Sequence, residues 1–292
     1  MNGVNNFEFI TKCFLEQKSS FNRLNVLEFD ENFIFLLKEN KVLIRFFNLM
    51  KKNDIKINDR LLNEVKKEKE RICELEVMIF NIATTLKKFS RDFIFIKNYQ
   101  HYPDMGDDID IYVIKNYKNI KNEIVKSLGF IELPQKLFHR IGKKIMLKHK
   151  TNNIEVELHE RLGRVGEFNF NNFDILNYTQ KYNSEIIIPS NELKMIIQII
   201  QRIYTRSYLR ISEILYYFEK DKRKINVNLV ASLAGILNIT SGKIFYAEIL
   251  DCLFKENISL NNSLFIYKSP FIKIPLTKTL PIISKRLIPL YY

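Results

Sequence analysis

The first part of the chain carries apolar residues at helical spacing. From Asp59 to Leu86 they recur every three or four positions, which places them on one face of a helix. Asp59 is a residue type preferred at helix N-caps, so the sequence predicts that a long helix starts there. Residues 7–50 have a similar spacing of aromatic and aliphatic side chains and predict two or three further helices. We therefore expect residues 1–90 to form an N-terminal helical region.

At Phe93 the pattern changes to short runs of strand-forming residues. Some are fully apolar and others alternate between polar and apolar side chains, as half-buried strands do. The runs are residues 93–96, 109–113, 145–147 and 154–158. A helical stretch at 119–128 precedes Gly129, the residue type that most often follows a helix. Residues 91–185 are thus expected to form an α/β core with a mixed sheet.

Helical spacing returns after Pro189. Further helices are predicted at residues 193–203, 209–218, 227–238 and 243–255. The last 30 residues contain four prolines and no acidic residue, and proline at that spacing excludes a helix. Residues 186–292 are therefore expected to be a helical domain with an extended tail. The whole chain is predicted to be a mixed α+β protein, with a small mixed-sheet core flanked by helical regions.

Composition narrows the class of protein. The chain has 292 residues, of which 46% are hydrophobic, and a formal net charge of +13, which is typical of a globular protein with an anionic partner. Its three cysteines, Cys13, Cys73 and Cys252, lie in apolar helical patterns and are interpreted as reduced core thiols. We find neither a signal-peptide pattern nor an apolar run of about 18 residues that could span a membrane. We expect a cytoplasmic protein without a membrane partner.

The strongest chemical signal is a group of carboxylates on two predicted strands. Asp108 and Asp110 are two positions apart, so on a strand both side chains point to the same side. Carboxylates this close repel each other, and a hard cation such as Mg²⁺ relieves the repulsion. Glu155 and Glu157 share a face of the strand at 154–158, and either could complete a three-carboxylate cluster if the two strands are neighbours.

Such a cluster is typical of phosphoryl and nucleotidyl transfer. Two metal ions held by Asp108, Asp110 and Glu157 would bind the phosphates of a nucleoside triphosphate and activate an attacking hydroxyl. Two nearby residues have alternative interpretations. His159 either orients a carboxylate or the substrate, or is an ordinary buried histidine. Lys97 either binds phosphate or is a surface charge.

Several segments also resemble the nucleotidyltransferase superfamily with the polymerase-beta-like fold, and most closely a prokaryotic family of predicted nucleotidyltransferases. The similarity extends over roughly residues 75–220. The segments that carry it are Ile96-Lys97-Asn98, Tyr102-Pro103 followed by Gly106-Asp107-Asp108-Ile109-Asp110, Val156-Glu157-Leu158-His159, Ile188-Pro189-Ser190 and Leu209-Arg210-Ile211-Ser212-Glu213. One departure is Asn98-Tyr99, where the superfamily usually has glycines after the first strand.

The resemblance implies Mg²⁺-dependent transfer of a nucleotide from a nucleoside triphosphate to a hydroxyl or phosphate acceptor. It implies that Asp108, Asp110 and Glu157 are the catalytic, metal-binding residues. Lys97 and Asn98 would contact the nucleotide. The accessory residues would be Glu155, His159 and Arg210.

Basic segments indicate an anionic acceptor such as RNA. Residues 133–154 contain six Lys and Arg and no acidic residue, and form either a cationic rim of the site or an ordinary solvated hairpin. Residues 186–292 carry 15 Lys and Arg against 7 Asp and Glu. Within them Arg202, Arg206 and Arg210 have the spacing of a cationic ridge on one helix. The alternative is a catalytically inactive protein of the same fold that acts as a nucleic-acid-binding or assembly module.

Overall fold

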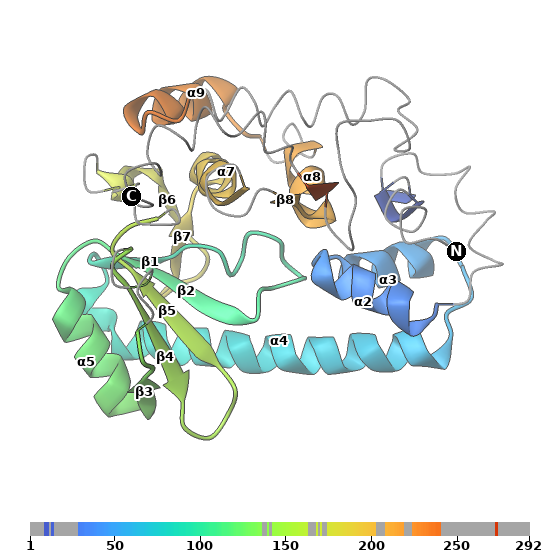
Figure 1. Ribbon diagram of the computed structural model, residues 1–292, viewed down its shortest axis with the longest axis horizontal. Helices are drawn as coiled ribbons and strands as arrows, with labels where there is room; N and C mark the ends of the chain where they lie inside the picture. The colour runs from blue at the N-terminus through green and yellow to red at the C-terminus, as the bar shows by residue number, and fades with distance from the viewer. Residues whose placement is uncertain are drawn as a thin grey trace, which may run out of the picture. The chain divides into compact units, whose positions relative to one another are not determined.

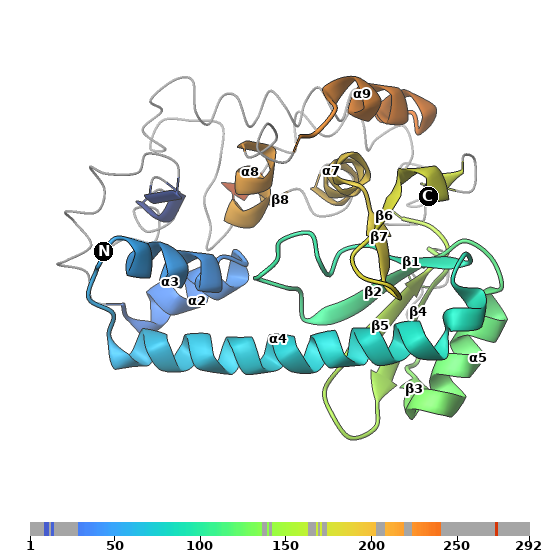
Figure 2. The same ribbon diagram turned by 180° about the vertical axis from the view of Figure 1, so that it is seen from behind.

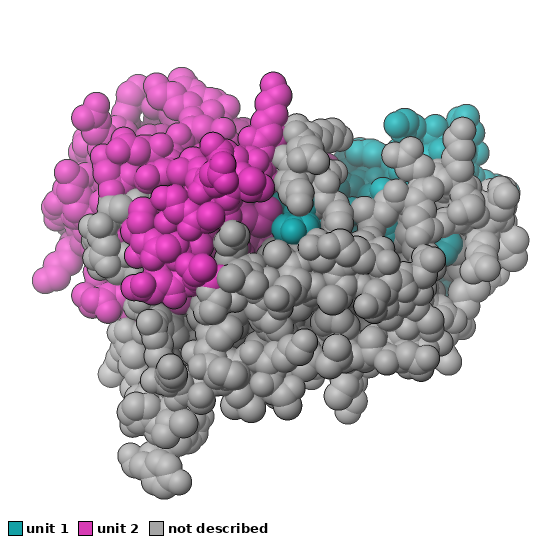
Figure 3. All heavy atoms as spheres, turned by 90° about the horizontal axis from the view of Figure 1, so that it is seen from above, with its two compact units in different colours: residues 1–72, 207–220, 247–292 teal, residues 73–206, 221–246 magenta. Residues whose placement is uncertain are grey.

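The computed structural model of the chain describes residues 9–11, 13–14, 29–135, 139, 142–162, 168, 170, 174–202, 208–218, 224–240 and 272–273. The chain divides into two compact units that are discontinuous in sequence (Figure 3). Unit 1 comprises residues 1–72, 207–220 and 247–292, and unit 2 comprises residues 73–206 and 221–246. These bounds differ from the three consecutive segments expected above, which are residues 1–90, 91–185 and 186–292. The assignment of a separate role to each of those segments stays a prediction.

Unit 1 is built mainly of helices. Its elements are α2 (Glu31–Glu39), α3 (Leu43–Lys52), the first part of α4 (Asp59–Thr85), α8 (Ile211–Phe218), and the antiparallel strands β8 (Tyr208–Leu209) and β9 (Ile272–Lys273) (Figure 1). The rings of Phe33 and Phe46 pack edge to face, with centroids 5.4 Å apart. Buried Asn40 joins α2 to α8, because its Oδ1 accepts a hydrogen bond of 3.1 Å from the Ile211 N–H. The expected N-terminal helices are confirmed for residues 31–72.

The long helix α4 runs from unit 1 into unit 2. The Asn58 side chain accepts a hydrogen bond from the Leu61 N–H, so Asn58, and not Asp59, caps the helix. The predicted apolar stripe is buried at Leu61, Val65, Ile72, Leu75, Ile79, Ile82 and Leu86. Cys13 is buried as expected, but Cys73 is exposed, because it lies one position beyond Ile72 and therefore off the stripe. Cys252 lies outside the described residues.

Unit 2 contains the mixed sheet that the sequence predicts (Figures 1 and 2). Its strands, in spatial order, are β1 (Phe93–Phe95), β2 (Asp108–Val113), β5 (Glu155–His159), β4 (Lys144–His149) and β3 (Phe130–Glu132). The central pair, β2 and β5, is parallel, and the other pairs are antiparallel. Helix α5 (Tyr117–Leu128) lies between β2 and β3 in sequence and ends at Gly129, whose φ of 72° suits glycine. The fold is therefore mixed α+β, as expected.

The two faces of the central strands differ in character. Ile109, Ile111 and Val113 of β2, with Val156 and Leu158 of β5, are apolar and buried. The alternate positions of the same strands carry the acidic residues and His159. One face of the sheet therefore belongs to the core, and the opposite face carries the candidate chemistry.

Unit 2 has further elements before and after the sheet in sequence. They are the 3₁₀ helices η2 (Lys87–Phe89) and η4 (Ile175–Tyr178), the antiparallel strands β6 (Thr179–Lys181) and β7 (Ile187–Pro189), and the helices α7 (Asn191–Ile199) and α9 (Val227–Ile236). The Ser190 side chain caps α7 by accepting a hydrogen bond from the Leu193 N–H. The predicted helix at 243–255 lies outside the described residues, as does the tail except for β9.

The predicted arginine ridge is wrong. Helix α7 ends at Ile199, the chain forms β8 at Tyr208–Leu209, and α8 begins at Ile211, so Arg202 and Arg210 do not lie on one helix. Arg202 is also buried, and Arg206 lies outside the described residues.

Within the described ranges, no helix has both the length and the apolar character needed to cross a bilayer.

Candidate metal centre

The parallel pairing of β2 with β5 places the predicted carboxylates side by side. Asp108 lies opposite Glu155, and Asp110 lies opposite Glu157. The two strands are adjacent in the sheet although the chain between them forms α5, β3 and β4. The sequence left open whether the strand carrying Asp108 and Asp110 lies beside the strand carrying Glu157, and the structure shows that the two strands are neighbours.

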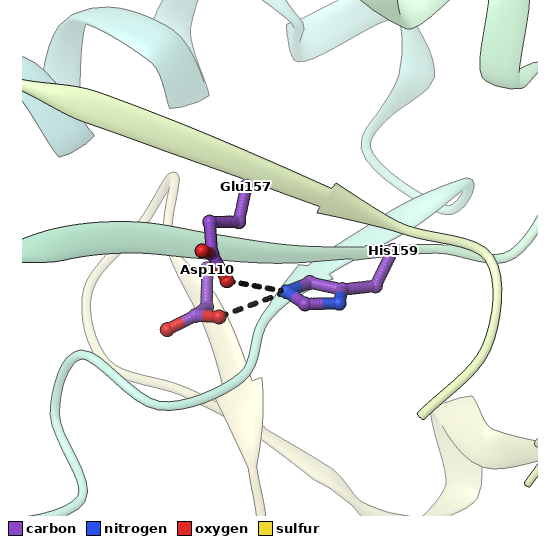
Figure 4. A group of neighbouring side chains, drawn as sticks. All are labelled: Asp110, Glu157 and His159. Atoms are coloured by element: carbon purple, nitrogen blue, oxygen red, sulfur yellow. Dashed lines mark hydrogen bonds and ion pairs between the residues drawn. The ribbon is translucent and has the colours of Figure 1, made fainter. Parts of the chain in front are cut away.

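Asp110, Glu157 and His159 form a compact cluster on the polar face of the sheet (Figure 4). All three side chains are buried, and one potential ligand atom from each lies within 4.8 Å of the others. His159 Nε2 is 2.8 Å from Asp110 Oδ1 and 3.3 Å from Glu157 Oε2. Two carboxylates and an imidazole that converge in this way could hold a metal ion.

Two lysines contact the same carboxylates. The Lys97 ammonium forms an ion pair with Asp110 Oδ1 and lies 4.0 Å from Glu157 Oε2. The Lys144 ammonium lies 2.5 Å from the other oxygen of that group, Glu157 Oε1. The two buried carboxylates are therefore neutralised by two ammonium groups, which meets the requirement that buried charges be paired.

These contacts set the protonation of the cluster. Burial raises the pKa of Glu157, but the hydrogen bond from His159 and the charges of Lys97, His159 and Lys144 together hold that pKa well below its usual range. Burial lowers the pKa of Lys97. The carboxylates of Asp110, Glu157 and Asp108 together raise it by more than burial lowers it, so the pKa of Lys97 is above its usual value. Glu157 is thus an anion and Lys97 a cation at neutral pH.

Asp108 lies beside this cluster but is not part of it. Its side chain is half-buried at the start of β2. The negative charge of Asp110, and then burial, raise the pKa of Asp108 to about 6. Of the three carboxylates predicted to bind metal, the structure therefore brings Asp110 and Glu157 together with His159 and leaves Asp108 at the edge. Glu155 is also half-buried.

The raised pKa of Asp108 predicts a dependence of stability on pH. A folded-state pKa above the unfolded value contributes stability that is complete below about pH 4 and is lost as the pH rises through about 6. Asp108→Asn removes this loss, so at pH 7.5 the metal-free variant should exceed wild type in free energy of unfolding by about 1–3 kcal/mol. Urea unfolding at pH 5 and pH 7.5, with chelator present, measures this. The exposed Asp107→Asn is the control, and equal pH dependence in all three proteins would contradict the prediction.

Asn98 fixes the chain segment that carries Lys97. Its side chain is 2% exposed; Nδ2 donates to the Asp108 carbonyl at 2.7 Å, and Oδ1 accepts from the Asp110 N–H at 3.1 Å. The amide thus continues the pairing of β1 with β2 beyond the end of β1. Buried Gln100 ties the same loop to α7 through a hydrogen bond of 3.0 Å to Gln198. The structure gives the Asn98 side chain a positioning role, and its contact with a nucleotide stays a prediction.

The other predicted basic residues are placed as follows. Lys143 forms an ion pair with Glu160, and Lys144 forms one with Glu157. Two of the positive charges of the basic segment at 133–154 are therefore paired with acidic residues of the protein itself. Lys136 and Arg140 lie outside the described residues. Arg210 belongs to unit 1, where its backbone N–H donates to Glu213, and its role as an accessory residue stays a prediction.

Sequence reasoning missed the role of Lys144. In the antiparallel pairing of β4 with β5, Lys144 lies opposite His159, and from there its side chain reaches Glu157. The signal was present in part, because Lys144 directly precedes the predicted strand at 145–147 and Glu157 lies on the predicted strand at 154–158. Only the register of that pair shows which lysine reaches which acid.

Comparison of the chain with protein-family models, with curated proteins and with solved structures gives no match.

Proposed function

We propose that this protein is a metal-dependent nucleotidyltransferase that transfers a nucleotide from a nucleoside triphosphate to a hydroxyl or phosphate acceptor. The observation that carries the proposal is the convergence of Asp110 and Glu157 from neighbouring parallel strands, with His159 beside them. Carboxylates in this arrangement repel each other, and a divalent cation would relieve that repulsion. The sequence motifs around these residues resemble those of nucleotidyltransferases, which supports the same conclusion.

The donor set fits a divalent metal. Carboxylate oxygens are the ligands that Mg²⁺ and Mn²⁺ prefer, and Mn²⁺ also accepts an imidazole nitrogen. Asp110, Glu157 and His159 would hold one ion, and Asp108 with Asp110 would hold a second, because these two carboxylates share a face of β2. When bound, the two ions would neutralise the triphosphate and activate the attacking oxygen.

In the proposed reaction an acceptor oxygen forms a bond to the α-phosphorus of the triphosphate. The bond from that phosphorus to the bridging oxygen breaks, pyrophosphate leaves, and the acceptor proton passes to solvent. Lys97 contacts the cluster from a segment fixed by Asn98, and its ammonium could pair with phosphate charge. Lys144 holds Glu157 Oε1 and leaves Oε2 directed to the cluster.

An anionic acceptor such as RNA suits the charge of the protein. The chain carries a net charge of +13, and residues 186–292 contribute most of the excess. Basic surface increases the rate at which polyanions associate and makes their binding sensitive to salt. We propose a cytoplasmic setting in which this surface brings the acceptor to the metal centre.

A specific observation favours the second candidate, an inactive protein of the same fold that binds nucleic acid or acts in assembly. Lys97 and Lys144 neutralise Asp110 and Glu157, so the cluster is electrostatically satisfied as a set of ion pairs. Two further features favour the inactive candidate. Asp108 is half-buried and lies outside the cluster of Asp110, Glu157 and His159. The chain has Asn98-Tyr99 at the position where the superfamily usually has glycines that approach the triphosphate.

The two candidates are separated by one experiment. The protein is incubated with each labelled nucleoside triphosphate in turn, Mg²⁺ or Mn²⁺, and total cellular RNA and protein. Label that enters a macromolecule or small acceptor supports the enzyme and identifies both nucleotide and acceptor. No incorporation with any nucleotide, together with salt-sensitive RNA binding, would support the inactive module instead.

A further inference from the structure

Two cationic or hydrogen-bonding groups converge on one pair of oxygens in the cluster. His159 Nε2 contacts Asp110 Oδ1 and Glu157 Oε2, and the Lys97 ammonium contacts the same two oxygens. A metal ion held by Asp110, Glu157 and His159 would need those oxygens as ligands. The Lys97 ammonium therefore lies where a metal ion would bind.

Lys144 differs from Lys97 in the oxygen that it contacts. It lies 2.5 Å from Glu157 Oε1, whereas the oxygen that His159 Nε2 contacts is Oε2. Both lysines have similarly exposed side chains, 20% for Lys97 and 22% for Lys144. They are thus a matched pair: each places one positive charge beside the same carboxylate, but only Lys97 lies on the oxygens that a metal would take.

We propose that Lys97 is a resident counter-ion that occupies the cation position of this centre and must be displaced before a divalent metal can bind. This inference rests on the proposed function, because it concerns the same metal centre. It adds a regulatory property: the protein holds its own competitor for the metal.

Electrostatics require the displacement. A divalent ion and an ammonium group that share two carboxylate oxygens would repel each other strongly in a buried setting, where the effective dielectric constant is low. The Lys97 side chain can withdraw, because it is flexible and partly exposed to solvent. Its backbone stays in place, since Asn98 and Gln100 anchor the segment on either side of Tyr99.

The displaced ammonium needs a new anionic partner. The phosphates of a nucleoside triphosphate supply one, and the metal ion arrives bound to those phosphates in the usual substrate complex. If metal bound alone, the displaced Lys97 ammonium would be left without an anionic partner. If metal binds together with the triphosphate, the ion pair of Lys97 with Asp110 is replaced by an ion pair of Lys97 with phosphate. The centre should therefore bind free metal weakly and load mainly with its substrate.

The test is Mn²⁺ affinity, measured by electron paramagnetic resonance of free Mn²⁺ without nucleotide. The proteins are wild type, Lys97→Met, Lys144→Met and Asp110→Asn. We expect Lys97→Met to bind Mn²⁺ about tenfold or more tightly than wild type, because it removes the occupant of the site as well as one charge. Lys144→Met also removes one positive charge beside Glu157 but vacates no ligand position, so it should tighten Mn²⁺ binding by a smaller factor than Lys97→Met does.

The outcomes separate this inference from the proposed function. If Lys97→Met binds Mn²⁺ no more tightly than Lys144→Met, Lys97 is not the competitor and the inference is overturned. If Asp110→Asn binds Mn²⁺ as wild type does, or if none of the proteins binds it, the metal centre itself is wrong and both proposals fail. Should Lys97→Met be too unstable for binding measurements, Mn²⁺ must raise its melting temperature more than that of wild type; an equal or smaller rise overturns the inference.

Discussion

Replacement of Asp110 with Asn is expected to lower nucleotide transfer by about 10²- to 10³-fold, the usual effect of removing one group that stabilises charge in a transition state. Asp110 is the carboxylate that the two proposed metal ions would share, since it belongs to the cluster with Glu157 and His159 and lies on the same face of β2 as Asp108. An amide keeps the shape of the side chain but supplies no negative charge to a metal ion. Transfer of labelled nucleotide to the acceptor, together with Mn²⁺ binding, measures both consequences.

Two further variants make this prediction specific. Asp107→Asn changes an exposed acid three positions away, and should transfer nucleotide at the wild-type rate. Asp108→Asn leaves Asp110, Glu157 and His159 intact, so it should retain metal binding at the cluster while losing activity that depends on a second ion. Wild-type transfer by Asp110→Asn would refute the assignment of this cluster as the catalytic centre.

The alternation of side chains along two strands was enough to predict most of this centre. Asp108 and Asp110 share a face of β2, and Glu155 and Glu157 share a face of β5, because successive strand residues point to opposite sides. What the sequence left open was whether β2 and β5 are neighbours. That depends on how α5, β3 and β4 fold back between them, which is a tertiary property.

Errors arose where tertiary contacts override local pattern. Asp59 and Asn58 are both good capping residues, and only the hydrogen bond to Leu61 shows that Asn58 is the cap. The Arg202–Arg210 spacing fits a helix, yet Arg202 lies in the π-helical turn that follows α7, and the chain pairs as a strand at Tyr208–Leu209 before α8 begins. The resemblance assigns Asn98 to the nucleotide; in the structure its amide hydrogen-bonds to the backbone of β2, and contact with a nucleotide stays a prediction.

His159 is the residue whose role changes most between sequence and structure. The sequence offers it as an accessory residue or an ordinary buried histidine. In the structure its Nε2 lies within hydrogen-bonding distance of Asp110 and faces the same centre as both carboxylates. A nitrogen ligand makes the set more suitable for Mn²⁺ than an all-carboxylate site would be, because imidazole favours transition metals over Mg²⁺.

We therefore expect wild type to bind Mn²⁺ more tightly than Mg²⁺, and His159→Gln to weaken Mn²⁺ binding by about 10- to 100-fold, as the loss of a supporting group at a metal site does. Mg²⁺ binding should weaken less, since Asp110 and Glu157 supply the oxygens that it prefers. Competition of Mg²⁺ against Mn²⁺, followed by paramagnetic resonance, gives both affinities.

The matched control is His149→Gln, because His149 lies on β4 outside the cluster and accepts a hydrogen bond from the Thr151 N–H in the adjacent turn. It should keep the wild-type preference for Mn²⁺. An unchanged ratio of the two affinities in His159→Gln would show that His159 only hydrogen-bonds to Asp110. In that case Asp110 and Glu157 would bind the metal without the imidazole, and Mg²⁺ would be the expected ion.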